Sequence, residues 1–420
     1  MIRIVNAEDF RRADINLQAK DVSSTVAAII DDVRVNGDSA VLEYERRFDR
    51  VELSGLEVTR TETEEALRAV GEEYIAMLQR AAENIRAFHT KQVRTGFMFS
   101  PKEGVILGQR VIPLQRVGLY VPGGTASYPS SVLMNAIPAK IAGCEEIIIA
   151  TPPEIRPEIL AAAHVAGVTR VFKMGGAQAV AALAYGTESV PRVDKIVGPG
   201  NVYVAEAKRQ VFGRVAIDMI AGPSEILIIA DKNNSPAHLA ADMLAQSEHD
   251  KLASAILITD SQDLAGSVSG EIESQIVKLS RHDIARASID DNGAIVIVKN
   301  IAEAVKIANE VAPEHLELCV DEPFEVMTRI RNAGSVFLGK NSPEALGDYY
   351  AGPNHTLPTM GTARFSSPLS VDDFVKKSQY IYYTEEVLRA AAGDIDRFAM
   401  SEGLTGHARS VTIRTEQEGR

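Results

Sequence analysis

After residue 119 the chain alternates short apolar segments with alanine-rich segments of helical periodicity, and this alternation limits the possible folds more than any other feature. Strands are expected near residues 146–150, 170–174, 195–197 and 225–230, with helices between them. Strands that alternate with helices pair in a parallel sheet, because each helix crosses over the sheet to the next strand. The pattern therefore predicts an α/β fold.

A second set of strands continues the same rhythm. Strands are expected at residues 255–260, 294–298, 316–320 and 335–338, and helices at 236–248, 262–279 and 301–311. A chain of 420 residues exceeds what one hydrophobic core usually supports, which favours two or three domains with a cleft between them. We therefore expect two tandem, incomplete Rossmann-like parallel-sheet domains.

The ends of the chain follow a different pattern. Residues 22–48 have apolar positions at helical spacing, interrupted by a turn at Asn36, Gly37 and Asp38, and a second helical stretch follows at about 64–91. Residues 105–119 then become strand-like. Near the C-terminus the expected elements are helices at 371–377, 385–392 and 395–402 and a strand at 410–414. We interpret these last residues as a small C-terminal arm.

These patterns give a provisional division into domains. The segments are an N-terminal segment (1–20), a first α/β domain (21–118 with 226–369), a second α/β domain (119–225) and a C-terminal dimerisation arm (370–420). The first of the two α/β domains contains the candidate catalytic and metal-binding residues described below. The second is expected to bind the cofactor.

Composition narrows the class of protein. The formal net charge is -13, from 44 Lys and Arg against 57 Asp and Glu, and such a surface repels nucleic acid. The N-terminus lacks the basic-then-apolar order of a signal peptide, and no apolar run approaches the length of a membrane span. Two cysteines cannot build a disulfide framework. We expect a cytoplasmic protein that binds neither nucleic acid nor a membrane.

The first candidate for chemistry is the adjacent pair Glu314 and His315, between a helical segment and an apolar strand. A carboxylate beside an imidazole offers two proton acceptors of different pKa, which suits a reaction that releases protons in more than one step. A helix C-cap with a surface salt bridge explains the same dipeptide equally well. The pair alone therefore leaves both interpretations open.

The second candidate lies at the end of a helix that Ser235 and Pro236 are expected to begin. Gln246 and His249 share one face of that helix, and one imidazole in such a pair is half of a metal site. The best suppliers of further ligands are Asp348, His355 and His407. The four other histidines outside these motifs are interpreted as ordinary surface or core residues: His89, His164, His238 and His282.

Glycine-rich turns follow three of the expected strands, at residues 121–124, 175–178 and 198–201. Each could bring backbone N–H groups near a phosphate at a helix start, but none has the G-x-G-x-x-G spacing, and singly each is more typical of a tight turn. Ser224 lacks the setting of a nucleophile elbow and is interpreted as a contact residue. Cys144 could act as an aldehyde-oxidising thiol, but its apolar surroundings favour a structural role.

Taken together, these segments resemble the histidinol dehydrogenase family over about residues 15–414. Any one of them is weak evidence, whereas eight in the right order are specific. The matching segments are 117–124, 175–178, 197–201, 221–225, 245–250, 312–316, 347–357 and 402–411.

The resemblance implies an activity and its cofactors. The family oxidises histidinol to histidine, the last steps of histidine biosynthesis, through an aldehyde that is hydrated before the second oxidation. It uses two NAD and one zinc per subunit. By resemblance, His315 would accept the proton of the alcohol, and Glu314 would activate the water that attacks the aldehyde.

The resemblance also implies binding roles and a partner. The zinc ligands would be Gln246, His249, Asp348 and His407. Tyr120, Gln178 and Asn201 match NAD contacts. The substrate contacts would include the zinc ligands and His315, together with Ser224, Glu402 and His355. The family forms homodimers in which the C-terminal arm reaches the partner's site, so Glu402 and His407 would act in trans.

Three rival functions remain at this point. Relatives of the family oxidise other small alcohols, although the residues that would bind an imidazole and an amine favour histidinol here. A zinc hydrolase would use the same residue types without a redox cofactor, but the three glycine turns would then have no role. A non-catalytic metabolite-binding protein would not need adjacent general bases.

Overall fold

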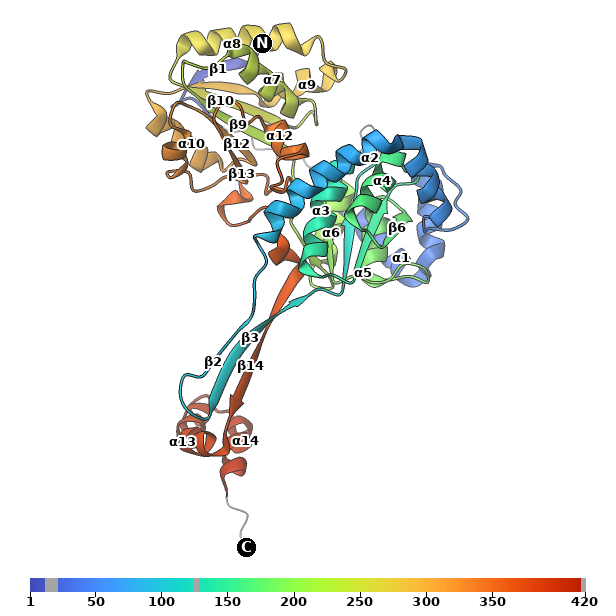
Figure 1. Cartoon of the computed structure of the whole chain (residues 1–420), viewed down its shortest axis with the longest axis vertical. Helices are drawn as coiled ribbons and strands as arrows, with labels where there is room; N and C mark the ends of the chain where they lie inside the picture. The colour runs from blue at the N-terminus through green and yellow to red at the C-terminus, as the bar shows by residue number, and fades with distance from the viewer. Residues whose placement is uncertain (12–21, 124–127, 417–420) are drawn as a thin grey trace. The chain divides into compact units, whose positions relative to one another are not determined.

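The computed structural model describes residues 1–11, 22–123 and 128–416 (Figure 1). It divides the chain into two compact units, of which the larger comprises residues 1–92 and 114–374 and the smaller residues 93–113 and 375–420. The larger unit contains two parallel sheets, and the smaller contains one antiparallel sheet and two helices. The predicted α/β class is confirmed.

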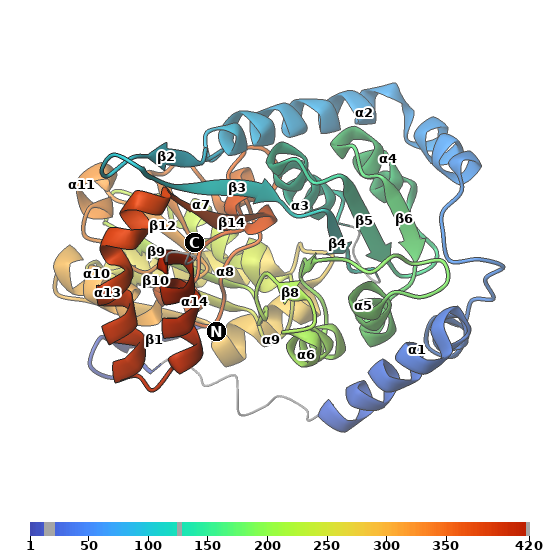
Figure 2. The ribbon, with the colours of Figure 1, turned by 90° about the horizontal axis from the view of Figure 1, so that it is seen from below.

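The first parallel sheet of the larger unit has five strands in the order β6-β5-β4-β7-β8. Its strands are β4 (Arg116–Tyr120), β5 (Glu146–Thr151), β6 (Arg170–Lys173), β7 (Lys195–Val197) and β8 (Ala216–Ile217). The helices that connect them are α3 (Pro129–Ala142), α4 (Pro157–Ala166), α5 (Gly176–Tyr185) and α6 (Val202–Val211). Figure 2 shows α3 and α4 on one face of this sheet and α5 on the other.

The second parallel sheet has six strands in the order β1-β11-β10-β9-β12-β13. Its strands are β1 (Arg3–Asn6), β9 (Glu225–Ala230), β10 (Ser254–Thr259), β11 (Ala294–Ile297), β12 (His315–Cys319) and β13 (Ser335–Leu338). The connecting helices are α7 (Pro236–Ser247), α8 (Gln262–Ile276), α9 (His282–Asn292), α10 (Ile301–Val311) and α11 (Pro323–Met327). The short helix α12 (Glu344–Tyr349) follows β13.

The two sheets repeat one connectivity. Apart from β1, which lies at the outer edge of the second sheet beside β11, the first three strands of each sheet run outward in one direction, and the fourth and fifth lie on the other side of the first, which is the order 3-2-1-4-5. The strand order therefore reverses between two neighbouring strands, which are β4 and β7 in one sheet and β9 and β12 in the other. Open α/β sheets bind ligands at such a reversal of strand order, at the carboxyl ends of the strands.

Alternating side chains of the sheets separate four hydrophobic clusters. In β5, for example, Ile147 and Ile149 pack in the cluster with α2, α3 and α4, whereas Ile148 packs in the cluster with α1, α5 and α6. A strand buried on both faces needs apolar side chains in consecutive positions, which explains the continuous apolar runs in the sequence. In the part of the chain that the structure describes, no helix has the length and apolar character needed to cross a membrane.

The helices at the N-terminus pack differently from the predicted grouping. The helix α1 (Ser23–Tyr44), with the expected break at Gly37, packs against α5, and the helix α2 (Arg60–Thr90) packs against α4 and α3. Both therefore cover the five-stranded sheet, although residues 21–118 were grouped with 226–369. Helical periodicity gives the apolar face of a helix but does not identify the sheet that buries it. Residues 12–21 lie outside the described residues. They include residues 12–20 of the predicted N-terminal segment 1–20.

The smaller unit corrects the prediction for the C-terminus. Residues 371–374 form a short 3-10 helix, and β14 (Val375–Tyr383) then pairs antiparallel with β3 (Val105–Pro113), which also pairs with β2 (Phe97–Phe99). The helix expected at 371–377 is therefore a 3-10 turn over its first four residues and strand over its last three. The helix α14 (Thr405–Thr415) replaces the predicted strand at 410–414, and it packs against α13 (Glu385–Ser401). Local β propensity in this segment is overridden by packing between the two helices.

Candidate active site

The pair Glu314 and His315 lies at the amino edge of the six-stranded sheet. The helix α10 ends in a left-handed residue, Ala312 (φ 51°), and Pro313 and Glu314 then lead directly into β12 at His315. The neighbouring strand β9 begins at Glu225, and its second residue, Ile226, is in register with His315. Glu225 therefore lies at the same edge of the sheet as Glu314 and His315. Ligands of such sheets usually bind at the opposite, carboxyl edge. This position therefore could not be inferred from strand order.

A backbone hydrogen bond fixes the orientation of His315, which is 3% exposed. The Nδ1 atom lies 3.0 Å from the carbonyl oxygen of Glu225, and a carbonyl can only accept, so Nδ1 carries the proton of this bond. The other ring nitrogen, Nε2, has no hydrogen-bond partner among the described residues. In the neutral ring, Nε2 is therefore a buried proton acceptor available to a substrate.

Glu314 is held beside this ring by the same strand. Its Oε2 atom accepts a hydrogen bond from the backbone N–H of Glu225 (2.9 Å) and lies 3.6 Å from His315 Nδ1. Burial raises the pKa of Glu314 to about 7, although the charge of His315 acts in the opposite direction. A carboxyl group with a pKa near neutral can exchange protons at physiological pH, which is the property of a general base.

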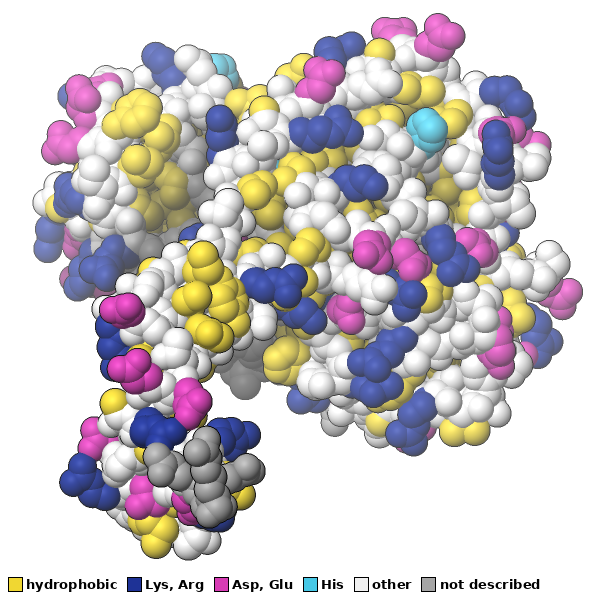
Figure 3. Space-filling view, turned by 60° about the horizontal axis from the view of Figure 1, so that its bottom comes forward, with side chains coloured by type: hydrophobic (Ala, Val, Ile, Leu, Met, Phe, Trp, Pro, Cys, Tyr) yellow, Lys and Arg dark blue, Asp and Glu magenta, His cyan; other side chains and the backbone are white. Residues whose placement is uncertain are grey.

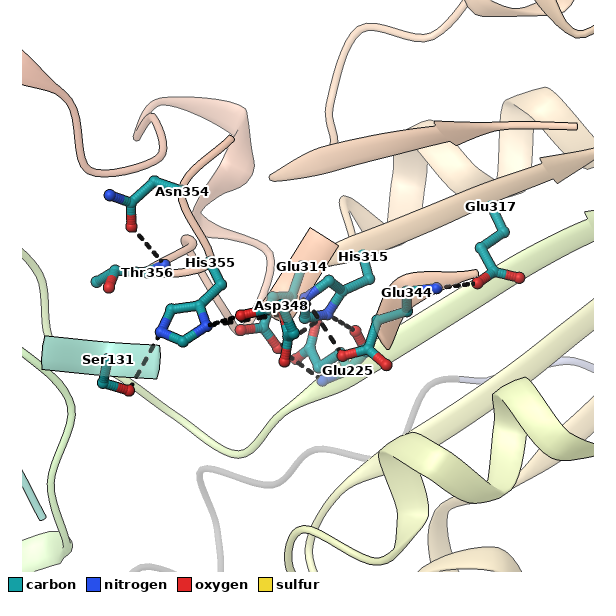
Figure 4. A network of polar contacts seen from close by, with 10 residues as sticks. All are labelled: Ser131, Glu225, Glu314, His315, Glu317, Glu344, Asp348, Asn354, His355 and Thr356. Atoms are coloured by element: carbon teal, nitrogen blue, oxygen red, sulfur yellow. Dashed lines mark hydrogen bonds and ion pairs between the residues drawn. The ribbon is translucent and has the colours of Figure 1, made fainter. Parts of the chain in front are cut away.

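Two further carboxylates lie near the free nitrogen of His315 (Figure 4). Asp348 Oδ1 is 3.6 Å and Glu344 Oε1 is 3.9 Å from Nε2, and both residues lie on one face of α12, four positions apart. Burial lowers the pKa of His315, but the carboxylates of Glu314, Asp348 and Glu344 outweigh burial and raise it to about 10. The three groups His315, Glu344 and Asp348 are close enough to hold a metal ion.

The predicted ligand Gln246 lies in this cluster. It is fully buried, and with its amide oriented to suit its neighbours it donates to Glu344 Oε1 (3.3 Å) and accepts from the N–H of Glu225 (3.1 Å). The helix α7 begins at Pro236 as expected but ends at Ser247 with Glu248 as its C-cap, so Gln246 lies in its last turn and His249 lies two residues beyond it rather than on the same helical face. Burial lowers the pKa of His249, while Asp348 is the largest influence in the opposite direction.

Two predicted substrate contacts flank the cluster. Ser224 immediately precedes β9 and Glu225. The Nε2 atom of His355 forms a hydrogen bond with Ser131 Oγ (3.1 Å), and its Nδ1 atom lies 3.0 Å from the backbone oxygen of Asp348 (Figure 4). The bond to Ser131 connects this site to α3 of the five-stranded sheet. The two parallel sheets therefore both contribute to the surroundings of the cluster.

The remaining predicted site residues, Glu402 and His407, belong to the smaller unit. Glu402 is the C-cap of α13 and His407 lies in the first turn of α14, and both are exposed. Of the predicted ligands, Gln246, His249 and Asp348 thus lie in the larger unit and His407 lies in the smaller one.

The predicted NAD contacts gather at the carboxyl edge of the five-stranded sheet. Tyr120 ends β4, Gln178 lies in the first turn of α5, and Asn201 is the N-cap of α6 directly after the β7 turn. The strand order reverses between β4 and β7, so these residues surround the switch point at which such sheets bind nucleotides.

The glycine turns at this edge are not open phosphate cradles. The N–H of Gly175 donates to Glu45 Oε1 (3.0 Å), that of Gly176 to the hydroxyl of Tyr120 (3.1 Å) and that of Gly198 to Asp218 Oδ2 (2.7 Å). Backbone donors with internal partners are unavailable to a cofactor phosphate. The interpretation of the turns at 175–178 and 198–201 as tight turns is therefore favoured. Part of the turn at 121–124 lies outside the described residues.

Sequence reasoning missed three buried carboxylates. Glu225 and Glu344 lie beside the catalytic candidates, and Glu45, in the π-helical segment Glu45–Asp49, also accepts from Gln178 Nε2 (3.0 Å). The spacing of Glu344, four residues before Asp348, was an available signal of a shared helical face. Glu45 offered no signal, because it lies 133 residues from Gln178.

The cysteines lack the properties of a reactive thiol. Cys144 and Cys319 are both free and buried. Burial raises the pKa of Cys144 to about 12, and burial together with nearby carboxylates also raises the pKa of Cys319. A nucleophilic cysteine needs a lowered pKa and access to substrate. The structural role expected for Cys144 is therefore the better interpretation.

Comparisons with known proteins agree on one family. A model of the family described as histidinol dehydrogenase matches residues 12–415. The chain is 57% identical to histidinol dehydrogenase of Syntrophotalea carbinolica over 398 residues, 94% of this chain and 92% of the relative. It is 52% identical to that of Bacillus cereus over 423 residues, 98% of this chain and 99% of the relative. The crystal structure of histidinol dehydrogenase from Elizabethkingia anophelis superposes with a TM-score of 0.92 at 36% identity, covering 98% of both chains.

Proposed function

We propose that this chain, which belongs to the histidinol dehydrogenase family, oxidises L-histidinol to L-histidine through histidinaldehyde in two NAD-dependent steps. The observation that carries the proposal is the buried pair Glu314 and His315, in which the Glu225 backbone orients both side chains. A pair held in this way provides two proton acceptors of fixed position. The two oxidations each release one proton to such an acceptor.

In the first step His315 accepts the hydroxyl proton of the alcohol. Its Nδ1–H bond to the Glu225 carbonyl leaves the lone pair on Nε2, and that atom takes the proton while the carbon gives its hydride to NAD. The products are the aldehyde, NADH and the protonated imidazole. Asp348, 3.6 Å from Nε2, stabilises this imidazolium.

In the second step Glu314 accepts a proton from water. The resulting hydroxide oxygen bonds to the aldehyde carbon and gives the hydrate as its monoanion, which loses a second hydride to a second NAD and becomes the carboxylic acid. Glu314 suits this role because its pKa of about 7 allows the ionised form at neutral pH. The same site thus performs both oxidations.

The donor groups of the cluster suit a zinc ion. Gln246, His249 and Asp348 of this chain, with His407, would hold it through oxygen and nitrogen atoms, and the carboxylates around His315 outnumber its single imidazole, which indicates an excess of negative charge there. When bound, zinc would bind the imidazole and amine of the substrate and offset the negative charge that raises the pKa of His315. Glu344, which contacts Gln246, would orient that ligand from outside.

NAD would bind at the β4 and β7 switch point, where Tyr120, Gln178 and Asn201 lie. Because the N–H groups of the two glycine turns have internal partners, side chains at this edge rather than those turns would contact the cofactor. A zinc hydrolase would leave this second site without a function. The presence of both regions in one unit therefore favours a dehydrogenase.

The smaller unit would form part of a homodimer. Large apolar side chains of this unit are exposed, and Figure 3 shows hydrophobic side chains on this unit among charges of both signs. Burial of such side chains against a second copy would remove them from water. They include Phe97, Met98, Phe99, Ile381, Tyr382, Phe398, Met400 and Ile413.

The activity itself is tested by stoichiometry. Purified protein with zinc, NAD and limiting histidinol is expected to form about two NADH per histidinol consumed, because one site performs both oxidations. Absorbance of NADH and chromatography of histidine measure the two products. Chelation of zinc should stop the reaction, and added zinc should restore it. An absence of histidinol-dependent NADH from the zinc-loaded protein contradicts the proposal.

The contribution of the arm in trans is tested by subunit exchange. His407→Ala and Glu314→Ala are each expected to be inactive, but an exchanged equal mixture should recover about a quarter of the wild-type activity. Half of the dimers would then be mixed, and each mixed dimer would hold one intact site. Mixtures without exchange serve as the control. A mixture that exchanges subunits but stays inactive would place each site within a single chain.

A further inference from the structure

We infer that the buried ion pair of Lys208 and Asp218 is a positioning device for NAD, which holds the turn at Gly198 against the end of β4. The inference rests on the proposed NAD site and adds two residues that would not themselves touch the cofactor. Both lie in the five-stranded sheet unit, Lys208 on α6 and Asp218 directly after β8.

The pair binds both polar backbone groups of one residue. Lys208 Nζ donates to the carbonyl oxygen of Gly198 (2.9 Å) and to Asp218 Oδ1, while Asp218 Oδ2 accepts from the N–H of Gly198 (2.7 Å). The side chains are 2% and 1% exposed. Charged hydrogen bonds between buried groups are strong and directional, so Gly198 has little freedom to move.

Gly198 lies where the strand order reverses. Its φ of 107° is a conformation that favours glycine, and a Cβ atom there would be 2.2 Å from the carbonyl oxygen of Tyr120. The turn after β7 is therefore in direct backbone contact with the end of β4. A shift of Gly198 would move this turn relative to Tyr120, one of the proposed NAD contacts.

The same turn also places Asn201. Three residues after Gly198, Asn201 is the N-cap of α6, where its Oδ1 accepts from the N–H groups of Tyr203 (3.0 Å) and Val204 (3.2 Å). Lys208 lies on the same helix and reaches back to Gly198, so strand, turn and helix are tied together. The ion pair therefore fixes the proposed contacts on both sides of the switch point.

A role in stability alone can be separated from a role in positioning. Removing one partner of a buried pair leaves an uncompensated charge, whereas replacing both with apolar side chains often restores stability. The apolar pair Lys208→Met with Asp218→Leu cannot, however, bind the N–H and carbonyl of Gly198. Stability and cofactor affinity are therefore expected to respond differently to the double substitution.

The experiment measures the Kd of NADH from its own fluorescence, in parallel with thermal unfolding and the KM for histidinol. Lys208→Met is expected to lower the Tm and to weaken NADH binding. The double variant should regain most of the Tm yet bind NADH roughly tenfold more weakly than wild type. Its KM for histidinol should stay within about twofold, since zinc and substrate bind in the other sheet.

Lys195→Met is the matched control. Lys195 is a buried lysine at the first residue of β7, the opposite end of the same strand, and pairs with Asp373 at 2.8 Å. It should lower the Tm without changing the Kd of NADH. A double variant of restored Tm with wild-type NADH affinity overturns the inference, and so does a Lys195→Met protein that loses NADH affinity equally.

A variant that keeps the charge of Lys208 tests the inference if the apolar variants do not fold. If the methionine and leucine variants do not fold, Lys208→Arg retains the charge but not the geometry, and it should weaken NADH binding about threefold. An unchanged Kd in that variant also overturns the inference. Wild-type protein that forms no NADH from histidinol overturns the proposed function instead, so the two failures are distinguishable.

Discussion

Glu314→Gln is expected to slow the oxidation of histidinaldehyde by about 10²- to 10⁴-fold, the usual contribution of a general base, and to slow the oxidation of histidinol to the aldehyde much less. In the wild type the backbone N–H of Glu225 donates a hydrogen bond to the Glu314 carboxylate (2.9 Å). The amide oxygen of glutamine can still accept this bond. The side chain therefore keeps its place but loses its ability to take a proton. Stopped-flow measurement of NADH with each substrate separates the two steps.

The pH dependence of the wild-type protein follows from the same residue. Burial raises the pKa of Glu314 to about 7, so the carboxyl is protonated below that pH and ionised above it. Only the ionised form accepts a proton from water. The rate of aldehyde oxidation should therefore fall as pH drops through about 7, and Glu314→Gln should remove this dependence.

Glu225→Gln provides a matched control for both measurements. Glu225 is a buried carboxylate on the neighbouring strand, and its Oε1 accepts from the N–H of Met360 (3.0 Å). Its substitution should affect the two oxidations equally, since it is not assigned a proton transfer. Equal losses of both oxidations in Glu314→Gln, with the pH dependence retained, would contradict the assignment of water activation to Glu314.

His315→Asn is expected to lower kcat for histidinol oxidation by about 10²- to 10⁴-fold, because no proton acceptor then replaces Nε2. The asparagine amide can donate to the carbonyl of Glu225 as Nδ1–H does, at 3.0 Å in the wild type. The strand and its neighbours should therefore be retained. Steady-state kinetics at saturating NAD and zinc measure the loss, and metal analysis shows whether the site still holds zinc.

His164→Asn is the control for the loss of an imidazole. His164 lies exposed on α4, away from the cluster, and its substitution should leave kcat unchanged. If His315→Asn keeps its zinc and still oxidises histidinol at the wild-type rate, then a different group accepts the alcohol proton.

Periodicity identified most elements of the larger unit. The strands β5, β6, β7 and β9 lie within a residue or two of the expected ranges, because strands buried on both faces form short apolar runs between turn residues. The elements of the smaller unit were harder to predict from periodicity. The strand β14 has exposed and half-buried residues and pairs with β3, more than 260 residues earlier, so its sequence has no apolar alternation to identify it.

The candidate site likewise has residues that the sequence implied and residues that only the structure revealed. Motif order implied Glu314, His315, Gln246, His249 and Asp348, and the structure brings Gln246, Asp348 and the proposed catalytic pair together at one edge of a sheet. The supporting residues Glu225 and Glu344 had no assigned role, since their effect depends on contacts between separate strands and helices. The amino-edge location was equally hidden, because strand order favours the opposite edge.

The sequence by itself determined the α/β class, the family and the residue types of the site, because these depend on local periodicity and on the order of motifs. Only the tertiary structure decided which sheet α1 and α2 cover, which nitrogen of His315 is free, and that the glycine turns near Tyr120 already have internal partners. These features arise from contacts between residues far apart in the chain. Burial and hydrogen bonding, which set them, exist only once the chain has folded.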